Sequence, residues 1–107
     1  MSSSYRKFDD YLMEKLRDPE EARVYLEVAL EEFEQDNDGE AFLLALRDVA
    51  EAQGGITALA KATNLNRQNL YKALSERGNP KLQTVNAILR SLGFRLSIES
   101  VEKAEAA

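Results

Sequence analysis

The sequence contains no cysteine and no histidine among its 107 residues. Their absence excludes disulfides, thiolate nucleophiles, most zinc sites and every catalytic triad built on histidine. A Gly-rich phosphate loop is also missing, and the carboxylates are expected on exposed helix faces, where no pattern suggests shifted pKa values. We therefore expect a protein that is not an enzyme and that uses neither a metal nor an organic cofactor.

Long apolar runs are missing as well. The N-terminal stretch MSSSYRKFDDY lacks the apolar run of a signal peptide, and no other stretch approaches the length of a membrane span. These absences predict a cytoplasmic protein without a membrane partner. The 44% of apolar residues in a chain of this length predicts one globular domain with a small core, which a second subunit could stabilise.

Charge is distributed unevenly along the chain. Residues 1–53 include fifteen acidic and six basic residues, a formal charge of −9, whereas residues 54–107 include eight basic and four acidic residues, a formal charge of +4. Between Ala52 and Phe94 the only acidic residue is Glu76. The overall charge of −5 thus hides an acidic first half and a basic second half, which indicates two different partners.

Apolar periodicity predicts an all-α fold of five helices. Asp18 and Pro19 form a typical helix start, and apolar residues then recur with helical spacing until DNDG at 36–39 ends the segment. Further helices are predicted over about 40–53, 57–63, 67–75 and 82–92. The predicted organisation is an N-terminal arm over 1–18, an acidic two-helix segment packed on the core over 19–53, a basic helical region over 54–93, and a strand with a tail over 94–107.

The stretch FRLSIES near the C-terminus alternates apolar and polar residues, which predicts a β-strand with Phe94, Leu96 and Ile98 on one face. A single strand leaves half of its backbone groups unpaired. The simplest partner is the same strand of a second copy across a two-fold axis, so we expect a homodimer. The last residues, 101–107, are expected to form a frayed tail.

A helix-turn-helix is predicted around the stretch LNRQNLYKALSERGNP. Ala60 provides a small residue where two helices cross, and Asn64 tolerates the positive φ that the turn requires. Asn66 suits the cap of the second helix, and Leu70 suits the contact that locks this helix to the first.

Four residues of the second helix are predicted to read bases: Arg67, Gln68, Asn69 and Lys72. The first turn of such a helix meets base edges in the major groove, where Arg pairs with guanine and Gln or Asn with adenine. Phosphate contacts are predicted for Lys61, Asn66, Tyr71, Lys81, Gln83 and Thr84, helped by the N-terminus of the last helix. Each contact has an alternative. The first turn of the helix is then only solvated, Tyr71 packs against the protein in place of a phosphate contact, and Asn66 acts only as a helix cap.

From Ile56 to Leu96 the chain resembles the Xre/Cro-type, λ repressor-like helix-turn-helix. More closely, it is similar to the "probable addiction module antidote protein" family of HigA-like antitoxins, which carry R-x-x-LYKAL, then GNP, a Thr, and LG before a strand. The upstream FDDYL, a Pro-Glu pair and YLEVAL match as well, so the resemblance covers about residues 8–98. The sequence departs from the family pattern at Asn64, where the family usually has Gly, and at Asn66, where the family commonly has Ser.

The resemblance implies a homodimer that binds an operator in its own promoter and also silences a small, usually basic toxin of the RelE/ParE class. The acidic first half offers a surface that attracts such a toxin over long range. The alternative is that its carboxylates only form the solvent-exposed face of an amphipathic helix. Two alternatives remain. One is a stand-alone Xre-type regulator without a toxin, which would not need the acidic extension. The other is a protein-interaction module that uses the helix-turn-helix only as a scaffold.

Overall fold

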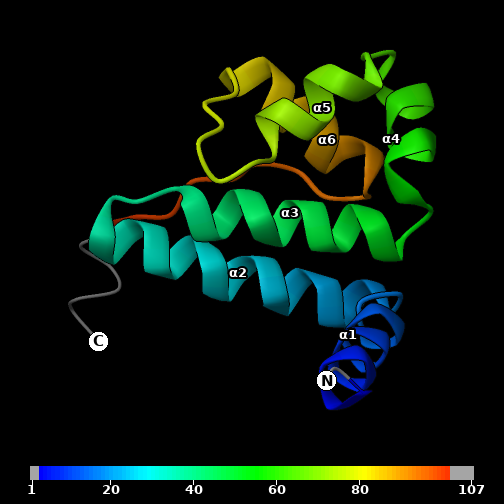
Figure 1. Ribbon diagram of the computed structural model, residues 1–107. Coiled ribbons are helices and arrows are strands. Elements are labelled where there is room, and N and C mark those ends of the chain that lie inside the picture. Colours follow the sequence, from blue (N-terminus) through cyan, green and yellow to red (C-terminus); the bar gives the residue numbers. More distant parts are fainter. Residues whose placement is uncertain (1–2, 102–107) are drawn as a thin grey trace.

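The computed structural model describes residues 3–101, with side chains from residue 9 onward. Its helices are α1 (Ser3–Lys15), α2 (Pro19–Asp36), α3 (Glu40–Ala52), α4 (Gly55–Thr63), α5 (Arg67–Ala73) and α6 (Leu82–Ser91). Helices α2 and α3 form an antiparallel pair, and α4, α5 and α6 cover the other side of α3 (Figure 1). The predicted all-α fold class is confirmed for the described residues. None of their helices is long and apolar enough to span a membrane.

Helix α2 begins and ends where the sequence predicts. The backbone N–H of Glu20 donates to Asp18 Oδ1 at 3.1 Å, and Pro19 occupies the first helical position, where its missing N–H costs nothing. At the other end Asn37 adopts a left-handed conformation with φ of 60°, and its N–H donates to the Phe33 carbonyl. Local capping chemistry therefore determines both bounds of this helix.

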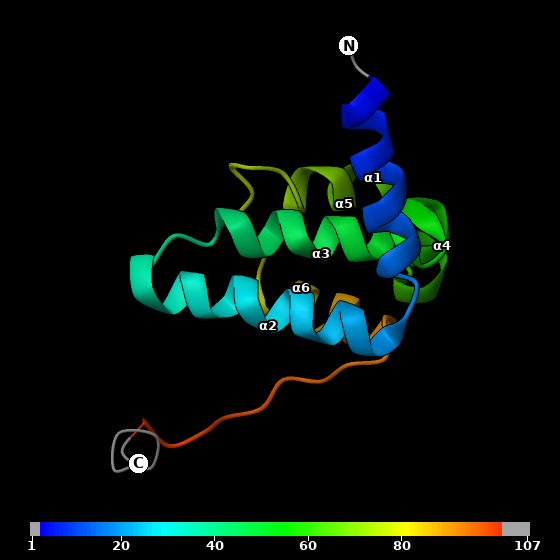
Figure 2. The same ribbon diagram turned by 90° about the horizontal axis from the view of Figure 1, so that it is seen from below.

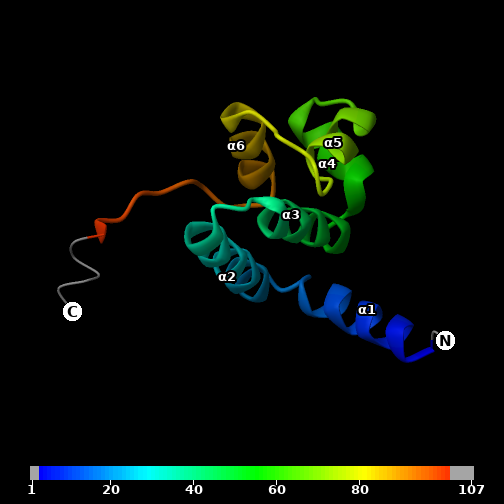
Figure 3. The same ribbon diagram turned by 60° about the vertical axis from the view of Figure 1, so that its left-hand side comes forward.

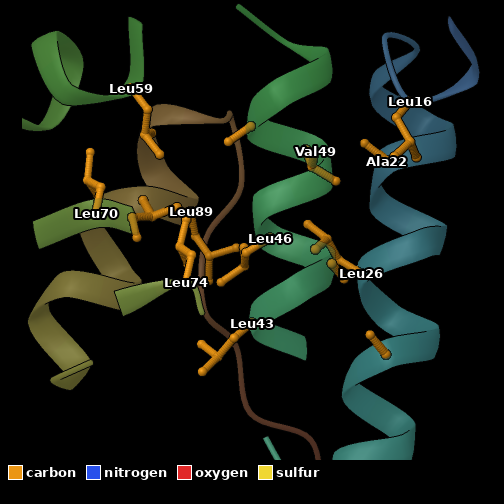
Figure 4. Packing of buried hydrophobic residues seen from close by; sticks show 14 of the residues in the cluster. Leu16, Ala22, Leu26, Leu43, Leu46, Val49, Leu59, Leu70, Leu74 and Leu89 are labelled. Atoms are coloured by element: carbon orange, nitrogen blue, oxygen red, sulfur yellow. The ribbon is translucent and has the colours of Figure 1, made fainter. Parts of the chain in front are cut away.

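Helix α3 lies at the centre of the fold and buries two faces. Leu43 and Leu46 point toward α5 and α6, where they approach Leu74 and Leu89, whereas Val49 points toward α2 (Figure 4). Leu46, Val49 and Leu74 have no exposed surface. Helix α3 therefore packs on α2 with one face and on the helices of the basic half with the other.

A tyrosine–carboxylate hydrogen bond links α2 to α3. The Tyr25 hydroxyl donates to Asp48 Oδ2 at 2.6 Å in a half-buried position. Partial burial, together with this bond to a negatively charged acceptor, raises the pKa of the Tyr25 hydroxyl. Because the folded-state pKa lies above the unfolded one, this group stabilises the fold below about pH 10, and that stability is lost as pH rises further.

Tyr25→Phe is expected to lower the free energy of unfolding by about 1 kcal/mol at neutral pH, because Asp48 loses its donor. The variant should also lose less additional stability than the wild type between pH 10 and pH 12. Urea denaturation at a series of pH values measures both effects. Equal slopes of stability against pH in the two proteins would contradict this account of the hydroxyl.

The N-terminal segment differs from the predicted arm. Residues 3–15 form helix α1, so the described chain has six helices rather than five, and residues 1–2 lie outside the described part. The helix packs on α3 at its C-terminal end, where Leu16 is 1% exposed and Gln53 Nε2 donates to the Leu16 carbonyl. Its first half projects away from the bundle (Figure 3). Residues 3–15 thus form a helix that is anchored to the core at its C-terminal end.

The predicted C-terminal strand is not a strand in the single chain. Residues 94–100 carry neither helix nor strand and run away from the bundle as an extended segment (Figure 2). The physical reason is that the described residues offer no second strand to complete a ladder. Phe94 packs instead against the core of its own chain, with its N–H donating to the Leu89 carbonyl at 2.8 Å. Of the predicted tail, residues 102–107 lie outside the described part.

Candidate nucleic-acid interface

Helices α4 and α5 are joined by a turn of three residues, 64–66. Asn64 has φ of 61°, as its position in the turn requires, and the N–H groups of Asn64 and Leu65 both donate to the Ala60 carbonyl. Leu70 is 1% exposed and locks α5 into the core. The positive φ predicted for Asn64 is thus confirmed, and Leu70 is buried.

Asn66 caps helix α5 as predicted. Its side-chain oxygen accepts hydrogen bonds from the backbone N–H groups of Gln68 at 2.7 Å and Asn69 at 3.3 Å. These bonds satisfy two of the N–H groups that the first turn of a helix leaves unpaired. The cap matters here because α5 has only seven residues and little helical stability of its own.

Asn66→Ala is expected to lower the free energy of unfolding by about 1 kcal/mol, because the cap is lost. Asn66→Ser should retain nearly all of the stability, since a serine hydroxyl can accept the same bonds. Thermal denaturation followed by circular dichroism compares the three proteins. A serine variant as unstable as the alanine variant would indicate that Asn66 acts by something other than capping.

The four residues predicted to read bases all lie exposed on α5: Arg67, Gln68, Asn69 and Lys72. Within the described chain, none of their side chains makes an ion pair or a hydrogen bond. The opposite side of the helix and its C-terminal end are buried through Leu70 and Leu74. Helix α5 is thus held by its apolar side and presents free hydrogen-bonding groups to solvent, which suits contact with a polar ligand.

The residues predicted to contact phosphate are spread over three helices. Lys61 lies exposed on α4, Lys81 and Gln83 are exposed at the start of α6, and Thr84 is half-buried beside them. No side chain caps α6, so the N–H groups of its first turn keep their capacity to bind an anion. Tyr71 is 37% exposed on α5.

Two basic residues near α5 were missed by the sequence analysis. The Arg47 guanidinium lies 5.4 Å from the centre of the Tyr71 ring, a cation–π contact that joins α3 to α5. Arg47, Ser75 and Arg77 then line a shallow depression beside this contact. Arg47 was counted with the acidic half because it lies there in sequence. Since the contact is formed only by tertiary packing, no local pattern could have revealed it.

The loop after α5 folds tightly over the end of that helix. A Cβ atom at Gly78 would lie 2.2 Å from the Ala73 carbonyl oxygen, far closer than any side chain tolerates. Glycine is therefore required at this position by close approach of the backbone.

The acidic surface lies on the other side of the molecule. Helix α2 is separated from α5 and α6 by α3 (Figure 1). On α2, Arg23 forms ion pairs with Glu20 and with Glu27, the latter at 2.9 Å. The hydrogen bond and charge of Arg23 lower the pKa of Glu20. Most acidic residues of this helix form no ion pair, and α3 lies between them and the basic helices.

Comparison with known proteins identifies a family for this chain. The family described as "Probable addiction module antidote protein" matches residues 4–100. An uncharacterized protein of Haemophilus influenzae (strain ATCC 51907 / DSM 11121 / KW20 / Rd) is 32% identical over 99 residues, which cover 92% of this chain and 95% of the relative. No solved structure matches the chain. The family match extends over nearly all of the described residues, from α1 to the extended C-terminal segment, and the chain therefore belongs to the probable addiction module antidote protein family.

Proposed function

We propose that this protein is the antitoxin of a type II toxin–antitoxin module. It binds operator DNA as a homodimer, through a λ repressor-like helix-turn-helix formed by α4 and α5, and it neutralises a small basic toxin of the RelE/ParE class in the cytoplasm. The observation that carries the proposal is the family match over residues 4–100, since an addiction module antidote implies a toxin as its partner.

DNA binding is supported by the exposed polar side of α5. Arg67, Gln68 and Asn69 follow a capped N-terminus, and their side chains form no hydrogen bond or ion pair within the described chain, so a base edge can bond them without breaking such bonds. The flanking lysines Lys61 and Lys81 suit phosphates. No acidic residue other than Glu76 occurs between Ala52 and Phe94, which limits repulsion of the duplex.

Dimerisation is supported by the C-terminal segment. Leu96 is 45% exposed and Ile98 is 97% exposed, and the backbone of residues 94–100 forms no ladder within the described chain. Pairing with a second copy would bury both side chains and satisfy the backbone groups. A dimer with its two α5 helices about 34 Å apart would meet successive major grooves of a palindromic operator.

Co-expression of the tagged chain with its neighbouring open reading frame, followed by affinity purification, tests the proposal. A small basic protein that co-elutes in a stable ratio supports the antitoxin function. A chain that is recovered alone, is dimeric and shifts its own promoter DNA would instead indicate a stand-alone Xre-type regulator. A chain that elutes with the partner but never binds DNA would leave only the toxin-neutralising part of the proposal.

A further inference from the structure

An apolar groove runs between α1 and α2, on the side of the molecule away from α5. Tyr11 and Leu12 of α1 form one wall, Val24 and Val28 of α2 form the other, and alanines of α3 form part of the floor. Its volume is about 500 Å³. The groove exists because α1 packs on α3 at one end and projects from the α2–α3 pair along the rest of its length (Figure 3).

The walls of the groove expose large apolar surfaces that the core does not use. Tyr11 is 62% exposed, Val28 50% and Val24 44%. The two valines are four residues apart, so they lie one turn from each other on the same face of α2. Neighbouring apolar side chains that are exposed along a groove suit contact with the apolar face of a partner helix.

The charge around the groove is negative. Helix α2 carries seven acidic residues and one basic residue, and two of the acidic residues, Glu21 and Glu32, line the groove at either end of the valine pair. Lys15 also lines it, but this lysine is paired with Glu21 at 3.7 Å. Glu32 has no ion pair within the described chain.

We propose that this groove is the docking site for a basic amphipathic helix of the toxin, an inference that rests on the proposed function. Apolar side chains one turn apart on that helix contact Val24 and Val28, and its flanking Lys or Arg residues pair with acidic residues such as Glu32. A second copy of this chain does not fit, because two acidic α2 helices would repel each other across a two-fold axis. DNA is excluded as the occupant of the groove, because the acidic residues of α2 repel its phosphates.

The test measures the affinity of the purified chain for the purified product of the adjacent open reading frame by calorimetry. Val28→Lys places a positive charge in the middle of the groove and should weaken binding by roughly tenfold or more. Gln35→Lys adds the same charge at an exposed position of α2 outside the groove and should change affinity by less than about threefold. Equal losses in the two variants would show that only long-range charge acts and would overturn the groove as docking site.

A second variant removes apolar contact without adding charge. Val24→Thr combined with Val28→Thr keeps the shape of both side chains, and it should also weaken binding while promoter DNA is shifted as by the wild type. If this double variant and Val28→Lys both bind the adjacent gene product as tightly as the wild type, the groove is not the docking site, while the antitoxin function stands. Failure of the wild-type chain to bind the adjacent gene product would overturn the proposed function together with the groove.

Discussion

Leu46→Ala is expected to lower the free energy of unfolding by about 2 to 5 kcal/mol, the range for truncating a fully buried leucine. Leu46 has no exposed surface and lies where α3 meets the helices of the basic half, close to Leu74 and Leu89 (Figure 4). The cavity cannot collapse easily because α3 is held on its other side by α2. Since small domains are stable by only about 5 to 15 kcal/mol, a loss of this size leaves the chain close to unfolding.

Urea denaturation followed by circular dichroism measures this loss, and Leu82→Ala is the matched control. Leu82 is 71% exposed at the start of α6, so the same substitution there should change the free energy of unfolding by about 0.5 kcal/mol or less. The wild type should unfold in one transition, because α3 contributes to the packing of both halves. A Leu46→Ala protein as stable as Leu82→Ala would contradict the central position of α3.

The parts of the fold that were predicted correctly are those determined by local chemistry. Asp18 and Pro19 begin α2 because an aspartate cap and a proline without an N–H suit a helix start wherever they occur. Asn64 takes a left-handed conformation because asparagine tolerates positive φ better than most side chains. Each of these outcomes depends on a few neighbouring residues, so the sequence alone contains the information.

The parts that were missed depend on tertiary contacts or on a partner. Helix α1 was taken as an arm because its first residues are polar, whereas its attachment depends on Leu16 and on Gln53, which is 37 residues away. The strand predicted over 94–100 needs a second strand, which the described part of one chain does not provide. Arg47 reaches Tyr71 only after α3 and α5 have packed together.

The exposed side of α5 was easier to predict than the groove between α1 and α2. Arg67, Gln68 and Asn69 are exposed because Asn66 caps the helix before them and Leu70 is buried after them. The positions of Asn66 and Leu70 in the sequence were enough to predict both roles. The groove between α1 and α2 was not predicted, because nothing in the sequence shows where α1 lies relative to Val24 and Val28. Their exposure results from the direction in which α1 leaves the bundle.

Replacing Arg67 and Gln68 together by alanine is expected to weaken operator binding by at least about a hundredfold. Each bidentate contact to a base contributes roughly 1 to 3 kcal/mol of discrimination, and a dimer would lose the contacts at both half-sites. Thermal stability should change little, because both side chains are exposed without a hydrogen bond or ion pair to another described residue, and the cap at Asn66 is unaffected. Fluorescence anisotropy with promoter DNA, measured at several salt concentrations, gives the affinities.

Lys81→Ala is the control that separates base reading from attraction to phosphate. If Lys81 meets a phosphate, its loss weakens operator and unrelated DNA about equally and reduces the slope of affinity against salt by about one per lost contact. The double variant should instead lose its preference for the operator while it retains binding to unrelated DNA. If it retains both the affinity and the preference of the wild type, α5 does not read DNA. The basic half would then act only as a scaffold, as expected of a protein-interaction module.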